Sequence, residues 1–180
     1  FAGHSYGELV ALTAAGRLTP DELVRLSRLR GKLMAEQRPG DPGAMLAVFA
    51  PLPDIQNLIT EKQLPVVVAN KNAPAQTVLS GSTPDIEAAE KAFVGSGVRC
   101  TKLAVAAAFH SPLVADAAVP FREALESVPF PAGSVPVFAN TTAAEYPVDA
   151  VAARDLLGHQ LANPVLFAQT VRALTDLGVR

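Results

Sequence analysis

The residues best suited to chemistry lie at the start of the chain, where Ser5 is the centre of a Gly-His-Ser-Tyr-Gly segment at positions 3–7. A Gly-x-Ser-x-Gly pattern between a strand and a helix is typical of a nucleophile elbow, a turn so sharp that the serine hydroxyl stands clear of the sheet. The amide of the next residue, Tyr6, then points toward the oxyanion of an attacked carbonyl. The pattern alone also fits a turn that only needs small residues. Its place between strand-like and helix-forming residues favours the elbow.

A serine nucleophile needs a general base, and the chain has three histidines. His110 precedes Ser111-Pro112 in a loop where a helix begins and two modules meet, and such loops often line a cleft. A loop histidine can instead cap or pack, but His110 is the best candidate for the base. His4 is adjacent to the serine and is expected to shape the pocket, and His159 lies in a helical stretch. No aspartate is placed to complete a triad, so a backbone carbonyl could orient the imidazole.

Arg30 lies on the apolar side of a predicted helix that runs from Thr19 to about Gln37. The leucines of this helix share one sector, together with Met34: Leu23, Leu26, Leu29 and Leu33. A buried guanidinium is costly unless it is paired. Arg30 therefore needs a carboxylate of the fold, a stem that reaches solvent, or a ligand carboxylate that its planar fork can bind.

The elements that must position these residues divide the chain into two α/β units. Residues 41–106 read as strand, helix, strand, strand, helix and strand, which is the ferredoxin-like β-α-β-β-α-β order. Residues 1–40 and 107–180 carry the serine, the arginine and the histidine on mostly helical segments, with a strand at 135–139. We predict that the small unit is inserted into the larger one, and that the larger unit is incomplete at both ends of this sequence. The predicted strands are 44–50, 65–69, 76–80 and 98–105, and the helices of the small unit are 53–62 and 83–95.

The composition excludes several classes of function. The chain has 180 residues, of which 49% are hydrophobic and 18% charged, so it can bury a sizeable core. A net charge of -2 argues against a nucleic-acid surface. The single cysteine, Cys100, excludes an internal disulfide and fits a reducing cytoplasm. There is no membrane-spanning run, signal peptide or metal-ligand cluster, so we expect neither a membrane nor a metal partner.

Five motifs, in order along the whole chain, resemble the malonyl-CoA:acyl carrier protein transacylases. The same set occurs in the acyltransferase domains of fatty acid and polyketide synthases. Each motif is modest alone, but the five together are specific. They are Gly-His-Ser-Tyr-Gly-Glu at 3–8, Arg30-Gly31, Asn72-Ala73-Pro74-Ala75-Gln76, Ala108-Phe109-His110-Ser111-Pro112-Leu113 and Gln160-Leu161-Ala162-Asn163-Pro164-Val165.

The resemblance implies an α/β-hydrolase-like core with a ferredoxin-like insert. It also implies transfer of a malonyl group from malonyl-CoA to the phosphopantetheine thiol of an acyl carrier protein, with no cofactor beyond these substrates. The roles that it implies are the acylated nucleophile for Ser5, the base for His110 and the malonyl-carboxylate ligand for Arg30. It further implies that the main-chain carbonyl of Gln160 holds the histidine, and that Asn72, His4 and Tyr6 line the site.

Two residues refine the resemblance. Malonyl-specific enzymes tend to carry His-Ala-Phe-His and methylmalonyl enzymes Tyr-Ala-Ser-His where this chain has Ala107-Ala108-Phe109-His110. Phe109 fits the malonyl type because its ring crowds an α-methyl group, whereas Ala107 departs from both. Tyr6 is similar to the residue of the iterative synthases that make enediyne cores or polyunsaturated fatty acids. The expected partners are therefore a carrier protein and the other domains of a cytoplasmic synthase.

The family also carries an upstream Gly-Gln-Gly-x-Gln segment, whose glutamine helps to form the oxyanion hole, and a later Gly-Pro segment. Neither occurs in these 180 residues. The loss of one oxyanion donor costs about 3 kcal/mol, so we expect weak activity unless flanking segments supply it. Two alternatives remain open. A serine thioesterase or esterase shares the elbow and the base but not the need for Arg30, and a non-enzymatic docking fragment needs neither.

Overall fold

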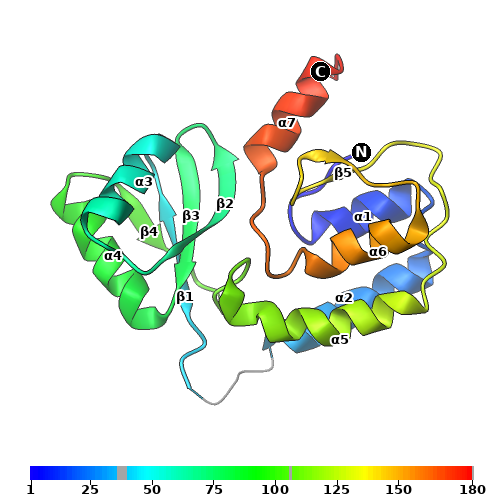
Figure 1. Ribbon diagram of the computed structural model, residues 1–180, viewed down its shortest axis with the longest axis horizontal. Helices are drawn as coiled ribbons and strands as arrows, with labels where there is room; N and C mark the ends of the chain where they lie inside the picture. Colours follow the sequence, from blue (N-terminus) through cyan, green and yellow to red (C-terminus); the bar gives the residue numbers. More distant parts are fainter. Residues whose placement is uncertain (36–39, 106, 180) are drawn as a thin grey trace.

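The computed structural model describes residues 1–35, 40–105 and 107–179, and Figure 1 shows two units side by side. The small unit runs from Ala44 to Lys102. The large unit is formed by both ends of the chain, which lie on the same side of the small unit. The last predicted residues of the second helix, 36 and 37, lie outside the described residues.

The small unit has the predicted order of elements around one antiparallel sheet. Its strands lie in the order β2-β3-β1-β4. Helices α3 and α4 cover one face of this sheet (Figure 1). The elements are β1 (Ala44–Val48), α3 (Leu52–Glu61), β2 (Val67–Ala73), β3 (Gln76–Gly81), α4 (Thr83–Gly95) and β4 (Cys100–Lys102).

The interior strand β1 is buried on both faces, which explains its continuous apolar sequence. On one face Leu46 packs with Ile55 of α3 and Phe93 of α4. On the other face Met45 belongs to a smaller cluster that Phe109 covers from the returning chain. The sheet is thus the contact layer between the helices of the small unit and the loop that carries His110.

The large unit packs helices around an apolar core. Its elements are α1 (Gly7–Ala14), α2 (Pro20–Ala35), the 3-10 turn η1 (Pro112–Val114), α5 (Ala115–Glu126), β5 (Phe138–Ala139), β6 (Ala144–Glu145), α6 (Ala150–His159) and α7 (Phe167–Asp176). A capping box begins α2, because Thr19 Oγ1 accepts from the Glu22 amide while Glu22 Oε2 accepts from the Thr19 amide. The predicted apolar sector of α2 is confirmed, since Leu26 is fully buried and the other three leucines and Met34 pack against the same core.

Some predicted element lengths were wrong. The strand expected at 135–139 has two residues, since Pro136 has no amide proton and its carbonyl binds the amino group of Phe1. The strand expected before Ser5 is a single parallel bridge between Ala2 and Phe138. The strand expected at 98–105 has three residues, and β2 continues to Ala73 and so includes Asn72.

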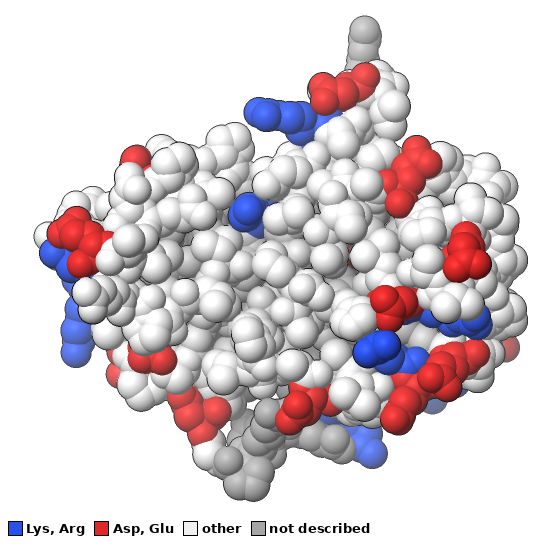
Figure 2. Space-filling view, viewed as in Figure 1, with Lys and Arg blue, Asp and Glu red and all other residues white. Residues whose placement is uncertain are grey.

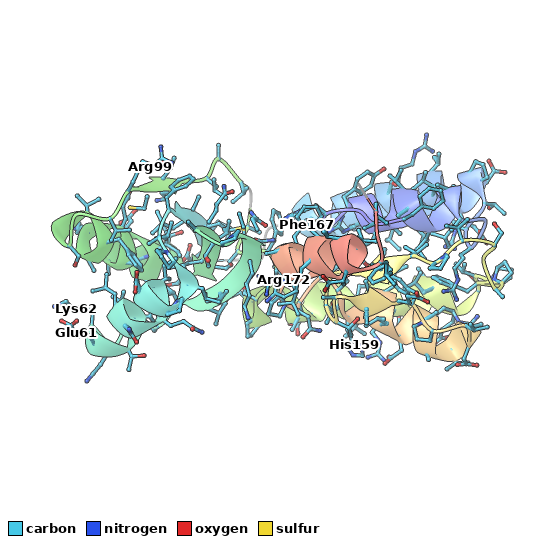
Figure 3. All side chains as sticks on the ribbon, turned by 90° about the horizontal axis from the view of Figure 1, so that it is seen from above. Glu61, Lys62, Arg99, His159, Phe167 and Arg172 are labelled. Carbon is cyan, nitrogen blue, oxygen red and sulfur yellow. The ribbon has the colours of Figure 1, made fainter. Side chains whose placement is uncertain are left out.

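Among the described residues, contacts at several places join the two units. The Ala108 amide donates to the Pro42 carbonyl at 3.1 Å, where the chain enters and leaves the small unit. Val165 pairs with the edge strand β2, since its amide donates to Ala69 and its carbonyl accepts from Lys71, both at 2.8 Å. Phe167, at the start of α7, lies between the units in Figure 3.

The charged side chains on the face shown in Figure 2 lie mostly near its outline, with few in the middle. Among the described residues, no helix has the length and apolar character that crossing a membrane requires.

Candidate active site

The serine lies on a sharp, conformationally unusual turn. Ser5 has φ 51°, in the left-handed region that non-glycine residues rarely adopt. The turn leads directly into α1, because the Gly7 amide donates to the His4 carbonyl at 2.9 Å. A Cβ on Gly3 would lie 2.1 Å from the carbonyl carbon of Gly7, so only glycine fits at position 3.

His110 faces the serine from the loop that returns from the small unit. Its Nε2 lies 2.9 Å from Ser5 Oγ. Its Nδ1 lies 3.0 Å from the carbonyl oxygen of Gln160 and 3.1 Å from that of Asn163. Carbonyl oxygens only accept hydrogen bonds, so the ring proton belongs on Nδ1, and Nε2 is left to accept the serine proton. Two backbone carbonyls therefore orient the imidazole.

Burial keeps this imidazole neutral. Desolvation, helped by the nearby charge of Arg30, lowers the pKa of His110 to about 4, although the two carbonyls act in the opposite direction. A histidine with this pKa is unprotonated at neutral pH and is ready to accept a proton.

Arg30 reaches the serine from α2. Its Nη2 donates to Ser5 Oγ at 2.8 Å and to Gln160 Oε1 at 3.4 Å. The side chain is 5% exposed, and its buried Nε has no hydrogen-bond partner in the structure. Within the described residues, no ion pair joins Arg30 to an aspartate or glutamate. The nearby carboxyl of Glu8 acts on the charge of this guanidinium without a close ion pair, and the buried Nε keeps a donor that a ligand carboxylate could use.

Gln160 contacts all three of these residues. Its main-chain carbonyl accepts from His110, and its side-chain Nε2 donates to the Ser5 carbonyl at 2.7 Å. Its Oε1 faces Arg30. Gln160 thus holds the serine backbone and orients the histidine.

The remaining predicted residues surround this centre at different distances. His4 Nε2 lies 2.7 Å from Asn72 Oδ1, across the junction between the units, and the His4 ring packs edge-on against Phe167. Tyr6 is half exposed, and its ring lies 5.9 Å from the Arg30 guanidinium carbon. Phe109 is partly buried beneath the small sheet and follows the chain directly into His110. The other histidine, His159, is partly exposed near the end of α6, and its Nδ1 lies 2.9 Å from the Asp155 carbonyl.

A groove of about 660 Å3 lies between β2 and α7. Asn72 lines it and binds His4, the neighbour of Ser5, so the groove adjoins the serine along the junction. Lys71 and Arg172 place two positive charges on its walls and Asp176 one negative charge, and Figure 3 shows Arg172 on α7.

Three buried residues near the serine escaped the sequence analysis. Asn140 accepts from the Ser5 amide at 2.6 Å, and Glu8 accepts from the Asn140 amide at 2.5 Å. Tyr146 donates its hydroxyl proton to the other oxygen of Glu8. Desolvation raises the pKa of Glu8 to about 7, against the effect of these hydrogen bonds. The only available signal was Glu8 in the first motif, since Asn140 and Tyr146 are more than 130 residues from the elbow in sequence.

The arrangement is a serine nucleophile with a neutral histidine base and an adjacent arginine. Among residues 1–35, 40–105 and 107–179, no cluster of His, Cys, Asp and Glu is arranged to hold a metal ion. The geometry supports covalent acyl transfer through Ser5 to or from an anionic substrate.

Comparisons with known proteins agree with this geometry. The sequence matches the acyl transferase domain family over residues 1–180. It is 36% identical to a polyunsaturated fatty acid synthase protein of Thraustochytrium sp., over 99% of this chain and 6% of that protein. It is 35% identical to the malonyl CoA-acyl carrier protein transacylase of Bacillus subtilis strain 168, over 99% of this chain and 57% of that protein. The chain thus spans little more than half of that transacylase.

Solved structures give the same result. The acyltransferase domain of an iterative polyketide synthase in enediyne biosynthesis superposes with a TM-score of 0.88 at 34% identity, over 96% of this chain and 45% of that one. The malonyl CoA-acyl carrier protein transacylase of Coxiella burnetii superposes with a TM-score of 0.91 at 30% identity, over 99% of this chain and 57% of that one. The fold is therefore the α/β fold of these acyltransferases, and the chain belongs to the acyl transferase domain family.

Proposed function

We propose that this chain transfers a malonyl group from malonyl-CoA to the phosphopantetheine thiol of an acyl carrier protein, through an acyl-enzyme on Ser5. One observation carries the proposal: Ser5 Oγ lies between a neutral imidazole at 2.9 Å and a buried arginine at 2.8 Å. The histidine accounts for activation of the serine. The arginine accounts for the choice of an acyl group with a free carboxylate.

Transfer occurs in two similar halves. His110 Nε2 removes the Ser5 proton while Oγ attacks the thioester carbonyl carbon, and the Tyr6 amide donates to the oxyanion. The tetrahedral intermediate then collapses, the C–S bond breaks, and CoA leaves as a thiol with the proton from His110. In the second half the carrier thiol gives its proton to His110 and attacks the Ser5 ester, which regenerates the serine.

Arg30 supplies the selectivity of this scheme. A malonyl carboxylate satisfies the unpartnered donor of the guanidinium, whereas an acetyl group leaves a buried charge unpaired. Phe109 stands where malonyl-specific enzymes tend to carry phenylalanine, and its ring would crowd the α-methyl group of a methylmalonyl substrate.

The groove between β2 and α7 is proposed to receive the pantetheine arm, with His4, Asn72 and Tyr6 at its inner end. Its position beside His4 and the excess of positive charge on its walls, Lys71 and Arg172 against Asp176, support this role. Gln160 positions the serine and the base.

We further propose that residues 1–40 and 107–180 form part of an α/β-hydrolase-like core, with residues 41–106 as a ferredoxin-like subdomain. The strand order of the small unit and the elbow of the large unit support this division. The similarity to a polyunsaturated fatty acid synthase and to an enediyne acyltransferase domain supports an iterative synthase as the parent protein. Its partners would then be a carrier protein, other synthase domains and further segments of the same domain, in the cytoplasm.

Mass spectrometry of the intact protein after incubation with malonyl-CoA tests the proposed function. We expect a malonyl adduct on the peptide that contains Ser5, its absence in Ser5→Ala, and its loss when a phosphopantetheinylated carrier protein is added. A folded protein that forms no adduct on Ser5 would contradict the proposal.

A thioesterase is the second candidate, because a serine and a neutral histidine serve hydrolysis equally well. Arg30→Ala separates the two. Loss of a charge-assisted contact should slow malonyl transfer by about 100-fold and raise the relative use of acetyl-CoA. Arg30→Lys is the matched control, since it keeps the charge without the fork. A hydrolase would release free acid at the same rate for both acyl groups in Arg30→Ala.

A further inference from the structure

Asn140 is a fully buried residue directly after β5, and its backbone and side-chain polar groups are all hydrogen-bonded. Its Oδ1 accepts from the Ser5 amide at 2.6 Å, and its Nδ2 donates to the Gly3 carbonyl at 2.8 Å. Its own amide donates to Glu8 Oε1 at 2.5 Å, and its carbonyl accepts from the Leu166 amide at 2.8 Å. One side chain therefore spans the elbow from the residue before His4 to the residue after it.

This span explains how the unusual conformation of Ser5 persists. A non-glycine residue with positive φ costs about 1–3 kcal/mol and persists only where its surroundings over-determine it. The Ser5 amide is held by Asn140, and the Ser5 carbonyl accepts from Gln160 Nε2 at 2.7 Å. Both ends of the strained residue are therefore fixed by side chains from distant parts of the chain.

The same bond decides which amide serves the oxyanion. Because Asn140 takes the Ser5 N–H, this donor is not free for the substrate. Within the described part of the chain, the Tyr6 N–H has no hydrogen-bond partner. Tyr6 is thus the elbow donor that remains for a developing oxyanion.

Glu8 fixes Asn140 in turn. The glutamate is 1% exposed in the first turn of α1, three residues after the serine. Its two oxygens accept from the Asn140 amide and from the Tyr146 hydroxyl. The end of β5 is therefore anchored to the helix that the elbow begins.

We propose that Asn140, anchored by Glu8, is a positioning residue for the nucleophile, which holds Ser5 Oγ in line with His110 Nε2. The proposal rests on the proposed function of Ser5, but it concerns the placement of the serine and not the identity of the acyl group. A residue that only stabilises the core would alter folding and leave the rate per folded molecule unchanged.

Asn140→Ala in the intact protein tests this distinction. We expect the single-turnover rate constant for Ser5 acylation by malonyl-CoA to fall about 100-fold per folded molecule, as expected for a misplacement of about 1 Å. The Kd for malonyl-CoA, measured by calorimetry in the Ser5→Ala background with and without the Asn140 change, should stay within about threefold.

Arg17→Met is the matched control. Arg17 is buried in the same unit and donates to the carbonyls of Pro131 and Pro147, at 3.2 and 2.6 Å. Its loss also removes two hydrogen bonds from the large unit, but it lies outside the elbow. We expect Arg17→Met to lower the thermal midpoint and to keep the acylation rate per folded molecule.

Two further variants test the proposal if Asn140→Ala does not fold. The isosteric Asn140→Asp keeps an acceptor for the Ser5 amide but faces the Gly3 carbonyl with a second oxygen, so its acylation rate should fall about tenfold. Glu8→Gln keeps an acceptor for the Asn140 amide, so its acylation rate should fall less than about threefold. The proposal would be overturned if Asn140→Asp acylated at the parental rate. It would also be overturned if Asn140→Ala, like Arg17→Met, lost stability but kept its acylation rate per folded molecule.

Labelling of Ser5 by a fluorophosphonate separates this proposal from the proposed function. The probe reports the reactivity of the serine without a malonyl group. If the parent protein is labelled but takes no malonate, the proposed function fails while the Asn140 variants still test positioning. If the variants are labelled at the parental rate, the positioning role fails whatever the acyl group is.

Discussion

At the scale of single residues, the contacts of Ser5 determine where its hydroxyl proton points. Arg30 donates to Oγ and so occupies one of its lone pairs. The hydroxyl proton is then free to point at His110 Nε2, the remaining acceptor at 2.9 Å. The arginine also helps to lower the pKa of the imidazole. The cation therefore adds to the effect of burial, which is the main reason that the imidazole stays neutral, and it leaves the serine proton directed at Nε2.

The pH dependence of acylation should show this lowered pKa. A base works only when it is unprotonated, and the pKa of His110 is about 4 rather than the ordinary value of 6.5. Between pH 7 and pH 5 the rate of Ser5 acylation should change by less than about twofold, whereas an ordinary imidazole would lose about 25-fold. Rapid-quench measurements after a pH jump provide the rate.

Glu8→Gln is the control for this experiment, because the pKa of Glu8 is about 7 and its ionisation falls in the same range. A change near pH 7 that disappears in Glu8→Gln belongs to the glutamate. A fall centred near pH 6.5 that persists in Glu8→Gln would contradict the low pKa of His110.

The sequence singled out the three residues that meet at the candidate site more readily than the residues that support them. A local pattern singled out Ser5 and helical periodicity singled out Arg30, whereas His110 was chosen because the serine needs a base and the chain has three histidines; the structure brings the three together. Asn140 could not be predicted, since a buried asparagine after a two-residue strand has no periodicity and its partner lies 135 positions away. Supporting contacts of this kind follow from tertiary packing, which one sequence does not reveal.

At the scale of elements, the elbow depends on one glycine more than on the other. The sequence pattern treats Gly3 and Gly7 alike. In the structure, a Cβ on Gly3 would lie 2.1 Å from backbone atoms of Gly7, whereas a Cβ on Gly7 meets nothing within 4 Å. The turn needs a glycine where the incoming chain crosses the first residue of α1.

Gly3→Ala and Gly7→Ala should therefore differ. Backbone atoms cannot yield as a flexible side chain does, so Gly3→Ala should lower the free energy of unfolding by about 1–3 kcal/mol and slow acylation by about 100-fold. Gly7→Ala should keep the rate within about threefold, since alanine favours the helix by about 0.5–1 kcal/mol. Urea unfolding and single-turnover acylation measure both effects, and equal behaviour of the two variants would contradict the close approach.

Long elements were predicted well and short ones poorly, for a physical reason. The helix α2 has a capping box and an apolar sector, which are local signals. The hairpin of β5 and β6 has two residues in each strand. Its pairing is determined by the bridge to Ala2 and by the loop around it, so alternation in the sequence has too little length to show it.

At the scale of the whole molecule, the site lies where the two units meet, and the junction is closely packed. Gly43 has φ +76°, and a Cβ there would lie 2.5 Å from the Ala108 Cβ and 2.7 Å from the Gly81 carbonyl oxygen. Ala108 precedes His110 by two residues and binds the Pro42 carbonyl through its amide. The path of the chain into the small unit thus contacts the segment that returns to the base.

Gly43→Ala should alter the packing at this junction and, through it, the rate of Ser5 acylation. Gly97→Ala is a matched control, because Gly97 has φ +74° but a Cβ there meets nothing within 4 Å. Both variants carry the cost of a left-handed alanine, about 1–2 kcal/mol. The free energy of unfolding of Gly43→Ala should fall by about 1–3 kcal/mol more than that of Gly97→Ala, because Ala108 must move to make room.

That movement should also displace His110 and lower the acylation rate per folded molecule by about tenfold or more, while Gly97→Ala acylates at the parental rate. Urea unfolding gives the stability of each variant, and the burst of Ser5 acylation gives the rate. Equal rates for the two variants would show that the base keeps its position when the junction moves. The large unit alone would then align the serine with its base, and the small unit would serve only the substrate.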